Sequence, residues 1–437
     1  MYTVEEALQK ILTGLSPLST ERVLLTECLS RVLAVDVLAD IAMPAFTNSA
    51  VDGYAVRACD VVGACEQNSV QLTCIGEIFA GVWPDVKIGE LTCVRIMTGA
   101  PLPEGADAIV MVEDSAFTAP DQITIYEAAT RGQHTRFAGE DVRMGDRVLV
   151  AGTLLRPAEI GLLAQMGQEH ISVFRAPRVA VFSTGDEVVE LEEGTLPPPG
   201  KIRNSNSYAL AALVQQAGAL VISRQHLPDD PTATQAALTQ YALPAPVSNM
   251  ATAEAEILTA NTKLWEERGV GNLKQADIII TAGGVSVGER DFVKAAIESV
   301  GTLDLWRVAM KPGKPIAFGK IGQTLIFGLP GNPVSAQVTF ELFVRPAIWK
   351  LLGRPASQLA RRGVEAILLE AVSHVPGRRE YIRAITEWEA GHFVTRPTGG
   401  QSSANGWTLS LANSLLIVPE NSEGVPAGEK VAVLLLE

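Results

Sequence analysis

The chain has 437 residues, of which 47% are hydrophobic and 19% charged, and its formal net charge is −14. This length predicts roughly two to four domains, and the hydrophobic content argues against global disorder. No apolar run reaches the roughly 18 residues that a membrane span needs, and the first seven residues do not resemble a signal peptide, so we expect a cytoplasmic protein with no membrane partner. The acidic balance disfavours nucleic acid as a partner, and any anion site must depend on local Lys, Arg and N–H groups.

The cysteines and histidines point away from a transition-metal centre. All five cysteines fall within the first hundred residues without a Cys-x-x-Cys pair, and the five histidines are scattered along the chain. These spacings disfavour a zinc site and predict reduced, structural thiols.

The N-terminal segment begins with a predicted helix. Apolar side chains recur at helical spacing over residues 4–13, and Thr3 and Glu6 have the spacing of a capping box. A second amphipathic helix is expected at Ala158–Met166. The N-terminal helical and linker domain is assigned to residues 1–29 and 144–175.

Residues 30–143 form a predicted β-rich domain. Short β-like runs alternate there with Gly, Pro and Asp turns. The clearest runs are Thr92–Met97, Ala108–Val112 and Gln122–Tyr126.

Residues 176–353 form a predicted doubly wound α/β domain, because strand and helix patterns alternate. The predicted strands are Arg178–Ser183, Ala219–Arg224 and Asp277–Thr281, and the predicted helices are Tyr208–Ala217 and Phe292–Val300. Short β runs return in 354–437 and end at Lys430–Leu436, which predicts a small C-terminal β-barrel or sandwich.

Three glycine-rich turns suggest a phosphate site built from several loops. The first follows the buried strand Asp277–Thr281 and contains Gly283, Gly284 and Ser286. The second is Lys311–Pro315, and the third is Gly328–Ser335. Such turns allow close backbone approach to an anion, and a following helix N-terminus offers unpaired N–H groups.

Carboxylates occur in four turn-like contexts. They are Asp52 before a glycine, Glu140 and Asp141 after one, Asp186 and Glu187 after a strand end, and Asp229 and Asp230 between prolines. Each alone fits an ordinary turn or cap. Together with the anion loops, they suggest oxygen ligands for Mg²⁺, which takes one or two carboxylates plus substrate oxygens.

These blocks resemble the molybdopterin molybdenumtransferases, the MoeA-type family that includes the C-terminal domain of gephyrin. The similarity runs in family order along nearly the whole chain. The similar blocks are Asn48–Arg57, Arg95–Pro101, Gly139–Asp141, Ser183–Glu187, Thr281–Asp291, Lys311–Pro315, Gly328–Ser335, Gln401–Asn405 and Leu411–Pro419.

The resemblance implies an elongated homodimer of four domains that inserts molybdate into adenylylated molybdopterin and releases AMP with the help of Mg²⁺. It implies catalytic carboxylates at Asp52, Asp141, Glu187, Asp229 and Asp291, with Asp141 and Glu187 as metal ligands. The implied substrate-binding residues are Thr98, Ser183, Thr184, Gly185, Gly283, Gly284, Ser286, Lys311, Lys314, Gly331, Asn332 and Ser335. A molybdopterin adenylyltransferase is an expected transient partner, and we expect the active site to be shared between subunits.

One departure from the family pattern lies between Asp229 and Thr281, where the chain is longer by some twenty residues. We expect the excess, residues 241–266, to be a surface excursion, since Pro244 and Pro246 break regular structure. Ala282 also stands where the family often has Ser.

The sequence leaves rival functions open. A P-loop and a Gly-x-Gly-x-x-Gly fingerprint are absent, which argues against a P-loop NTPase and a simple dinucleotide dehydrogenase. A related molybdopterin adenylyltransferase and a gephyrin-like scaffold remain alternatives, although the flanking β domains disfavour the first. Tungstate stays open as the oxyanion.

Overall fold

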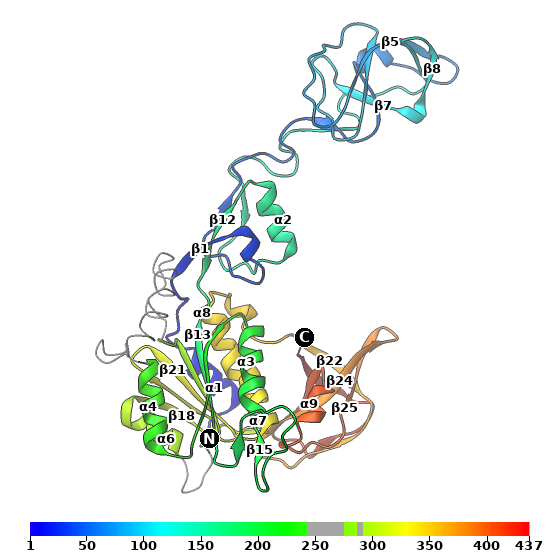
Figure 1. Ribbon diagram of the computed structural model, residues 1–437. Helices are drawn as coiled ribbons and strands as arrows, with labels where there is room; N and C mark the ends of the chain where they lie inside the picture. Colours follow the sequence, from blue (N-terminus) through cyan, green and yellow to red (C-terminus); the bar gives the residue numbers. More distant parts are fainter. Residues whose placement is uncertain (243–274, 286–291, 437) are drawn as a thin grey trace, which may run out of the picture. The chain divides into compact units, whose positions relative to one another are not determined.

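The computed structural model describes residues 1–242, 275–285 and 292–436, which fall into two compact units (Figure 1). The first unit contains residues 1–34 and 152–156 and the described part of 170–437. The second contains residues 35–151 and 157–169.

The centre of the first unit is a six-stranded sheet in the order β16-β13-β17-β21-β20-β18. The first four strands are mutually parallel, whereas β20 runs antiparallel to both β21 and β18. The strands are β13 (Arg178–Thr184), β16 (Leu220–Leu227), β17 (Ile278–Ala282), β18 (Thr302–Trp306), β20 (Ala317–Ile321) and β21 (Thr324–Leu329). β17 and β21 are buried along their whole length, as expected for parallel strands covered on both faces.

Helices cover both faces of this sheet (Figure 1). One face packs against α1 (Val4–Leu12), α3 (Asn206–Gln216), α7 (Pro333–Thr339), the π-helix Phe340–Val344 and α8 (Arg345–Leu351). The other face packs against α4 (Pro231–Ala242) and α6 (Phe292–Val300). Alternate residues of β13 point to the two faces of the sheet. Val179 and Val181 pack in the core on the α1 and α3 side, and Ala180 and Phe182 pack in the core on the α4 and α6 side.

The C-terminal part of the first unit is a closed five-stranded barrel. Its strands follow one another as β24-β25-β22-β28-β26, and β26 pairs back with β24. They are β22 (Gly363–Leu368), β24 (Arg379–Glu389), β25 (His392–Pro397), β26 (Ser414–Val418) and β28 (Lys430–Leu435). The short strand β19 (Met310–Lys311) follows β18 in the chain and pairs in parallel with β24, so it joins the Lys311 turn to the sheet of the barrel.

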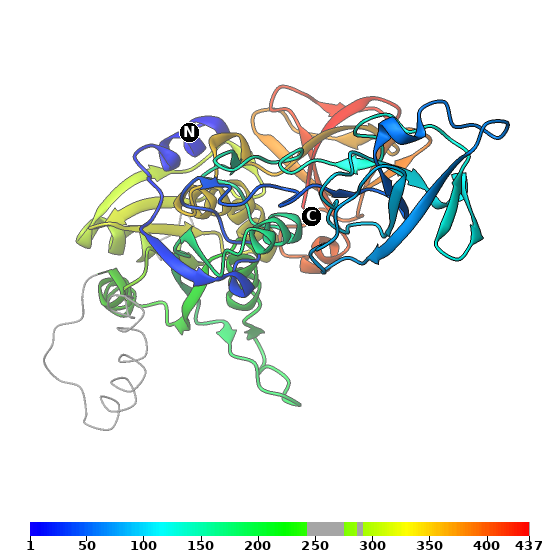
Figure 2. The ribbon, with the colours of Figure 1, turned by 90° about the horizontal axis from the view of Figure 1, so that it is seen from above.

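Shorter elements complete the first unit. β1 (Thr20–Leu24) pairs with β12 (His170–Phe174), and β14 (Val188–Val189) pairs with β15 (Ile202–Arg203). The chain between β14 and β15 projects as a green loop away from the sheet (Figure 2). The remaining elements are the 3₁₀ turns Leu25–Glu27 and Ala356–Gln358, β23 (Val372–Ser373), β27 (Gly424–Val425) and α9 (Gly406–Ser410).

The second unit is built on a six-stranded sheet in the order β7-β4-β6-β5-β9-β8. β5 and β6 are parallel, and the other neighbours are antiparallel. The strands are β4 (Gly53–Val56), β5 (Val70–Ile78), β6 (Thr92–Ile96), β7 (Ala108–Met111), β8 (Ser115–Ala119) and β9 (Gln122–Ile125). Its other elements are β2 (Val37–Leu38), β3 (Asn48–Ser49), Ala58–Val61, Val112–Asp114, β10 (Thr135–Arg136), β11 (Arg147–Leu149) and α2 (Pro157–Gln165).

The structure confirms the predicted α/β sheet, the β-rich segment and the C-terminal barrel. The capping box at α1 is also present: Glu6 N donates to Thr3 Oγ1 at 3.2 Å, and Thr3 N donates to Glu6 Oε2 at 2.8 Å. Both bonds satisfy N–H groups that have no partner within the helix, which is why the helix begins at Val4.

The expected excursion at 241–266 is wrong at its start. Tyr241 and Ala242 form the end of α4 and are buried in the core on the α4 and α6 side of the sheet. The ring of Tyr241 packs edge-on against that of Phe182, with 5.5 Å between the ring centres. Residues 243–266 lie outside the described part of the chain.

Two broader expectations concern membranes and thiols. No helix within the described residues is long and apolar enough to cross a membrane. All five cysteines are free thiols, as predicted, but only Cys28 and Cys93 are buried as structural thiols would be, whereas Cys59 and Cys65 are exposed.

Candidate functional site

The parallel strands bring several predicted site residues to one edge of the sheet. Ser183 of β13 is in register with Ala282 of β17, and Ala282 is in register with Leu329 of β21. The turns that follow these strands therefore leave the sheet side by side. Their neighbouring carboxyl ends are the place where α/β folds usually bind ligands.

The Gly283-Gly284 turn needs glycine. Gly283 has φ +105°, and a Cβ there would lie 2.5 Å from Thr184 Oγ1. Gly284 has φ +67°, and its Cβ would lie 2.9 Å from the Val293 side chain. The turn can therefore pack against the end of β13 only because it lacks side chains.

The edge of the sheet opens into a cavity of about 730 Å³, called here the edge hollow. Turns from β13, β17 and β21 line it together with the segment before α3. Of the predicted site residues, the edge hollow gathers Ser183, Thr184, Gly185, Glu187, Asp229, Gly283, Gly284, Gly331 and Asn332. Among the described residues, its charged lining consists of Glu187, Asp229 and Arg203.

The carboxylates of the edge hollow are held by their own turns. Asp229 N donates to Asp186 Oδ1 at 3.2 Å, and Asp186 N approaches Asp229 Oδ2 at 3.4 Å, so the two turns are tied together. The Glu187 carboxylate folds back over Gly185, where a Cβ would lie 2.7 Å from Glu187 Oε2.

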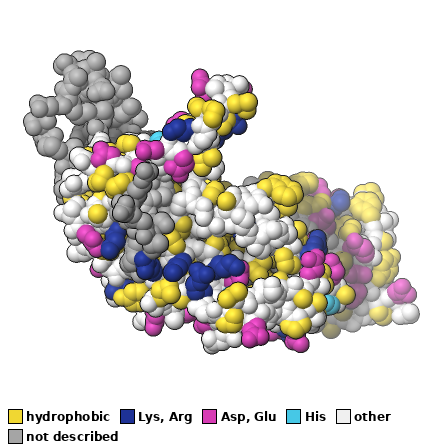
Figure 3. Space-filling view, turned by 90° about the horizontal axis from the view of Figure 1, so that it is seen from below, with side chains coloured by type: hydrophobic (Ala, Val, Ile, Leu, Met, Phe, Trp, Pro, Cys, Tyr) yellow, Lys and Arg dark blue, Asp and Glu magenta, His cyan; other side chains and the backbone are white. Residues whose placement is uncertain are grey.

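A second cavity of about 420 Å³ adjoins the first and is called here the basic hollow. Within the part of the chain that the structure describes, four lining side chains are cationic, namely Lys311, Lys314, Arg378 and Arg383, and one, Glu380, is a carboxylate. Ser335, Gln401, Ser402 and Ser403 add polar groups. Pro315 borders both hollows, so the second glycine-rich turn lies between them. Figure 3 shows a row of Lys and Arg side chains on the face seen from below.

The charges of the basic hollow are fixed by buried partners. Lys311 Nζ lies 2.8 Å from Glu380 Oε1, and Glu380 Oε2 lies 2.8 Å from Nδ1 of the buried His374. Arg383 is 1% exposed and donates to the carbonyl oxygens of Gly400 and Ser402, which holds the serine-rich segment in place.

Other predicted site residues lie elsewhere. Asp52, Thr98 and Asp141 belong to the second unit. Asp52 Oδ1 accepts hydrogen bonds from Thr98 Oγ1 at 2.6 Å and Thr98 N at 2.7 Å, and these two bonds lower the pKa of Asp52. Ser286 and Asp291 lie outside the described residues.

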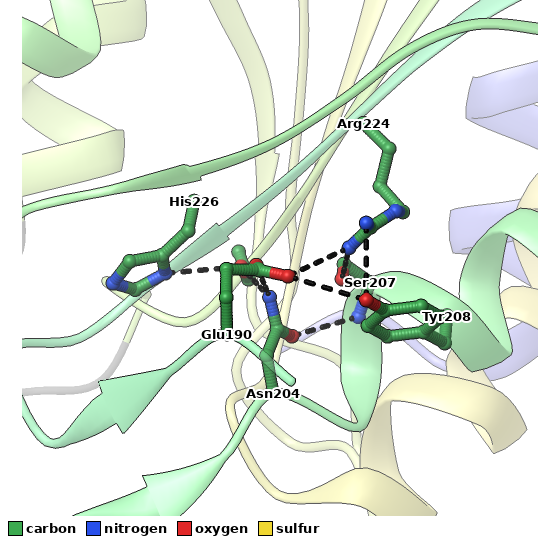
Figure 4. Close-up of polar contacts among 7 residues, drawn as sticks. Glu190, Asn204, Ser207, Tyr208, Arg224 and His226 are labelled. Atoms are coloured by element: carbon green, nitrogen blue, oxygen red, sulfur yellow. Dashed lines mark hydrogen bonds and ion pairs between the residues drawn. The ribbon is translucent and has the colours of Figure 1, made fainter. Parts of the chain in front are cut away.

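The sequence prediction missed a polar network beside the edge hollow, drawn in Figure 4. Asn204 lines that hollow and donates to Ser183 Oγ at 2.8 Å and to Glu190 Oε1 at 2.6 Å. Arg224 binds Glu190 Oε2 at 3.1 Å, and its guanidinium lies 3.9 Å from the centre of the Tyr208 ring. The polar run Arg203–Ser205 directly before α3 is a signal in the sequence that could have pointed to this network.

The edge hollow offers oxygen atoms of the kind that Mg²⁺ takes as ligands. Among the described residues, no group of three or more His, Cys, Asp or Glu side chains is placed to hold a metal ion. Mg²⁺ often takes only one or two carboxylates with substrate phosphates. Glu187 and Asp229 meet that need, and Thr184 Oγ1 and Asn206 Oδ1 are buried in the same lining without a hydrogen-bond partner in the described chain. The residues present therefore fit the ion.

Comparisons with known proteins agree along the whole chain. Family models match as the MoeA N-terminal region (domains I and II) at residues 2–167, a probable molybdopterin binding domain at 180–245 and 253–350, and the MoeA C-terminal region (domain IV) at 365–436. A molybdopterin molybdenumtransferase of Haemophilus influenzae is 36% identical over 99% of this chain and 98% of that protein. Gephyrin of Dictyostelium discoideum is 33% identical over 100% of this chain and 62% of that protein. The crystal structure of a molybdopterin biosynthesis MoeA protein from Pyrococcus horikoshii has a TM-score of 0.78 and 30% identity, and covers both chains fully.

Proposed function

The chain belongs to the molybdopterin molybdenumtransferase family, and from that membership we propose that it inserts molybdate into adenylylated molybdopterin and releases AMP. This reaction yields the molybdenum cofactor. The substrates are molybdate and the adenylylated pterin.

The observation that supports this proposal most is the pair of adjoining hollows with different charge. Counting the residues that the structure describes, the edge hollow carries two carboxylates and one arginine, whereas the basic hollow carries four cations and one carboxylate. Molybdate is a dianion and is attracted to the basic hollow, where Lys311 and Lys314 lie on one turn. The phosphate linkage of the nucleotide fits the edge hollow, where the glycine turns lack side chains and let the backbone approach an anion closely. Pro315 lies between the two substrates in this arrangement.

The residues of the chain then have separate tasks. The two lysines orient the oxyanion and stabilise the negative charge that develops as AMP departs. Gly283 and Gly284 leave room for the phosphate at the strand ends. Glu187 and Asp229 would hold Mg²⁺ in the edge hollow. Asp141, which belongs to the second unit, stays a candidate metal ligand. When bound, the ion acts as a Lewis acid that neutralises negative charge on the phosphate oxygens.

The proposal extends to assembly and surroundings. We expect a homodimer in the cytoplasm, with a molybdopterin adenylyltransferase as a transient partner that supplies the adenylylated substrate. Light scattering at micromolar concentration tests the dimer, and a fully active monomer would rule it out.

The activity is tested by mixing purified protein with adenylylated molybdopterin and Mg²⁺ and measuring AMP. We expect AMP to appear when molybdate is added and not when sulfate is added. Parallel reactions with tungstate decide which oxyanion is preferred. Equal AMP release without any added metal oxyanion contradicts the proposal.

A further inference from the structure

The buried amide of Asn204 has only one orientation that satisfies its neighbours. Asn204 is 2% exposed, and its Oδ1 accepts a hydrogen bond from Ser207 N at 3.2 Å. Since a backbone N–H can only donate, the oxygen must face Ser207. The two amide hydrogens therefore point to Glu190 Oε1 and to Ser183 Oγ.

Glu190 reinforces this orientation from the outside. Its second oxygen accepts from Arg224 at 3.1 Å, and Arg224 is stacked on Tyr208 (Figure 4). Burial raises the pKa of Glu190, but the hydrogen bonds from Asn204 and Arg224 outweigh this effect and the pKa is lowered. A carboxylate can only accept, so it holds the amide nitrogen of Asn204 on its side.

Ser183 has a second neighbour in the network. His226 Nδ1 lies 3.1 Å from Ser183 Oγ, on the strand paired with β13. With the imidazole proton on Nδ1, both neighbours donate to the hydroxyl oxygen. The hydroxyl proton is then left to point into the edge hollow, which Ser183 lines.

We propose that Asn204 is a positioning residue that, together with His226, makes Ser183 a hydrogen-bond donor to the phosphate of the nucleotide half of the substrate. This inference rests on the proposed function, because it places AMP in the edge hollow. Glu190 and Arg224 act one step further out, by fixing the direction of the Asn204 amide.

The direction of the hydrogen bond between positions 204 and 190 can be reversed without removing the bond. In the double variant Asn204→Asp with Glu190→Gln, the amide and the carboxylate exchange places. The pair still shares a hydrogen bond, and position 204 still accepts from Ser207 N. The new carboxylate accepts the proton of Ser183, so the hydroxyl can no longer donate to a phosphate in the edge hollow.

The experiment measures binding of AMP to the full chain by calorimetry in the presence of Mg²⁺, together with melting temperatures. We expect Ser183→Ala to raise the AMP Kd roughly tenfold, the size expected for one hydrogen bond to a charged group. The double variant should raise it to a similar degree with little change in melting temperature. Combining it with Ser183→Ala should add nothing further, because both changes remove the same bond.

A single variant and a control keep the test independent of how well the double variant folds. Asn204→Ala should also weaken AMP binding, because Ser183 loses the donor that directs its proton. Asn413 is the matched control: its amide bridges Thr386 N and O in the barrel at 2.8 and 2.9 Å, and Asn413→Ala should lower stability without changing the AMP Kd. For Asn204→Ala, KM for the adenylylated pterin should rise by a larger factor than kcat falls.

Wild-type AMP affinity in Ser183→Ala overturns the inference, as does wild-type affinity in the double variant. Failure of the wild-type chain to bind AMP overturns it too. Failure of the proposed function looks different: the wild-type chain then binds AMP, and the variants differ as expected, but molybdate releases no AMP from the adenylylated pterin.

Discussion

The ion pair between Lys311 and Glu380 provides two substitutions with opposite expected effects. Lys311→Met removes a cation of the basic hollow, whereas Glu380→Gln removes its single carboxylate and keeps a hydrogen-bond acceptor for His374. An oxyanion in this hollow should bind more weakly to the first variant and more tightly to the second. A higher molybdate concentration should partly restore the rate of Lys311→Met.

The magnitude follows from exposure and Coulomb's law. Two unit charges about 4 Å apart interact by roughly 4 kcal/mol at an effective dielectric constant near 20. The Lys311 side chain is 49% exposed, so solvent screening reduces its contribution to about 1–2 kcal/mol. Since about 1.4 kcal/mol is a tenfold change in affinity, KM for molybdate should rise roughly 5- to 30-fold.

The assay is AMP release as a function of molybdate concentration. Lys87→Met is the charge-matched control, because Lys87 pairs with Glu104 on the surface of the second unit, and KM should not change. If Lys311 serves only to hold Glu380, both substitutions in the pair should shift KM in the same direction. That result would refute the electrostatic role of the basic hollow.

Charge removal elsewhere should separate catalysis from stability. Glu187→Gln and Asp141→Asn should each lower turnover by roughly two or more orders of magnitude with little change in melting temperature, whereas wild-type rates would show that both are simple turn residues. Glu341 is 8% exposed and bound by two guanidinium groups, so Glu341→Gln should lower the free energy of unfolding by about 3–5 kcal/mol in urea titrations. Hydrogen bonds from Thr98 lower the pKa of Asp52 in the folded state. The contribution of Asp52 to stability is therefore present above the pKa that it has in the unfolded chain, and it is lost as the pH falls. The melting temperature of the wild type should drop more steeply below about pH 4 than that of Asp52→Asn.

The sequence predicts elements well where local signals are strong. The alternating strands of the α/β domain carry β-branched runs that end in glycine, and α1 carries its own capping box. By contrast, α4 escapes prediction, because Pro231–Ala242 is rich in Ala and Thr and has no clear apolar stripe. Its burial depends on packing against α6 and the sheet, which only the fold supplies.

The site was predictable only in part, for a similar reason. Parallel strands necessarily bring their carboxyl-end turns together, so the glycine turns near Ser183 and Gly283 could be expected at one edge. The Asn204 network could not be expected, because Ser183, Glu190 and Arg224 belong to separate parts of the chain that only the fold brings together. The basic hollow depends likewise on Arg378 and Arg383, which the barrel contributes through the pairing of β19 with β24.

The proposed reaction of this chain couples molybdate insertion to AMP release. It can be followed in a single turnover with adenylylated molybdopterin and molybdate, in which AMP in solution and molybdenum bound to the pterin are both quantified. We expect one molybdenum retained for each AMP released, and no AMP without the oxyanion. AMP release that proceeds without molybdenum retention would contradict it.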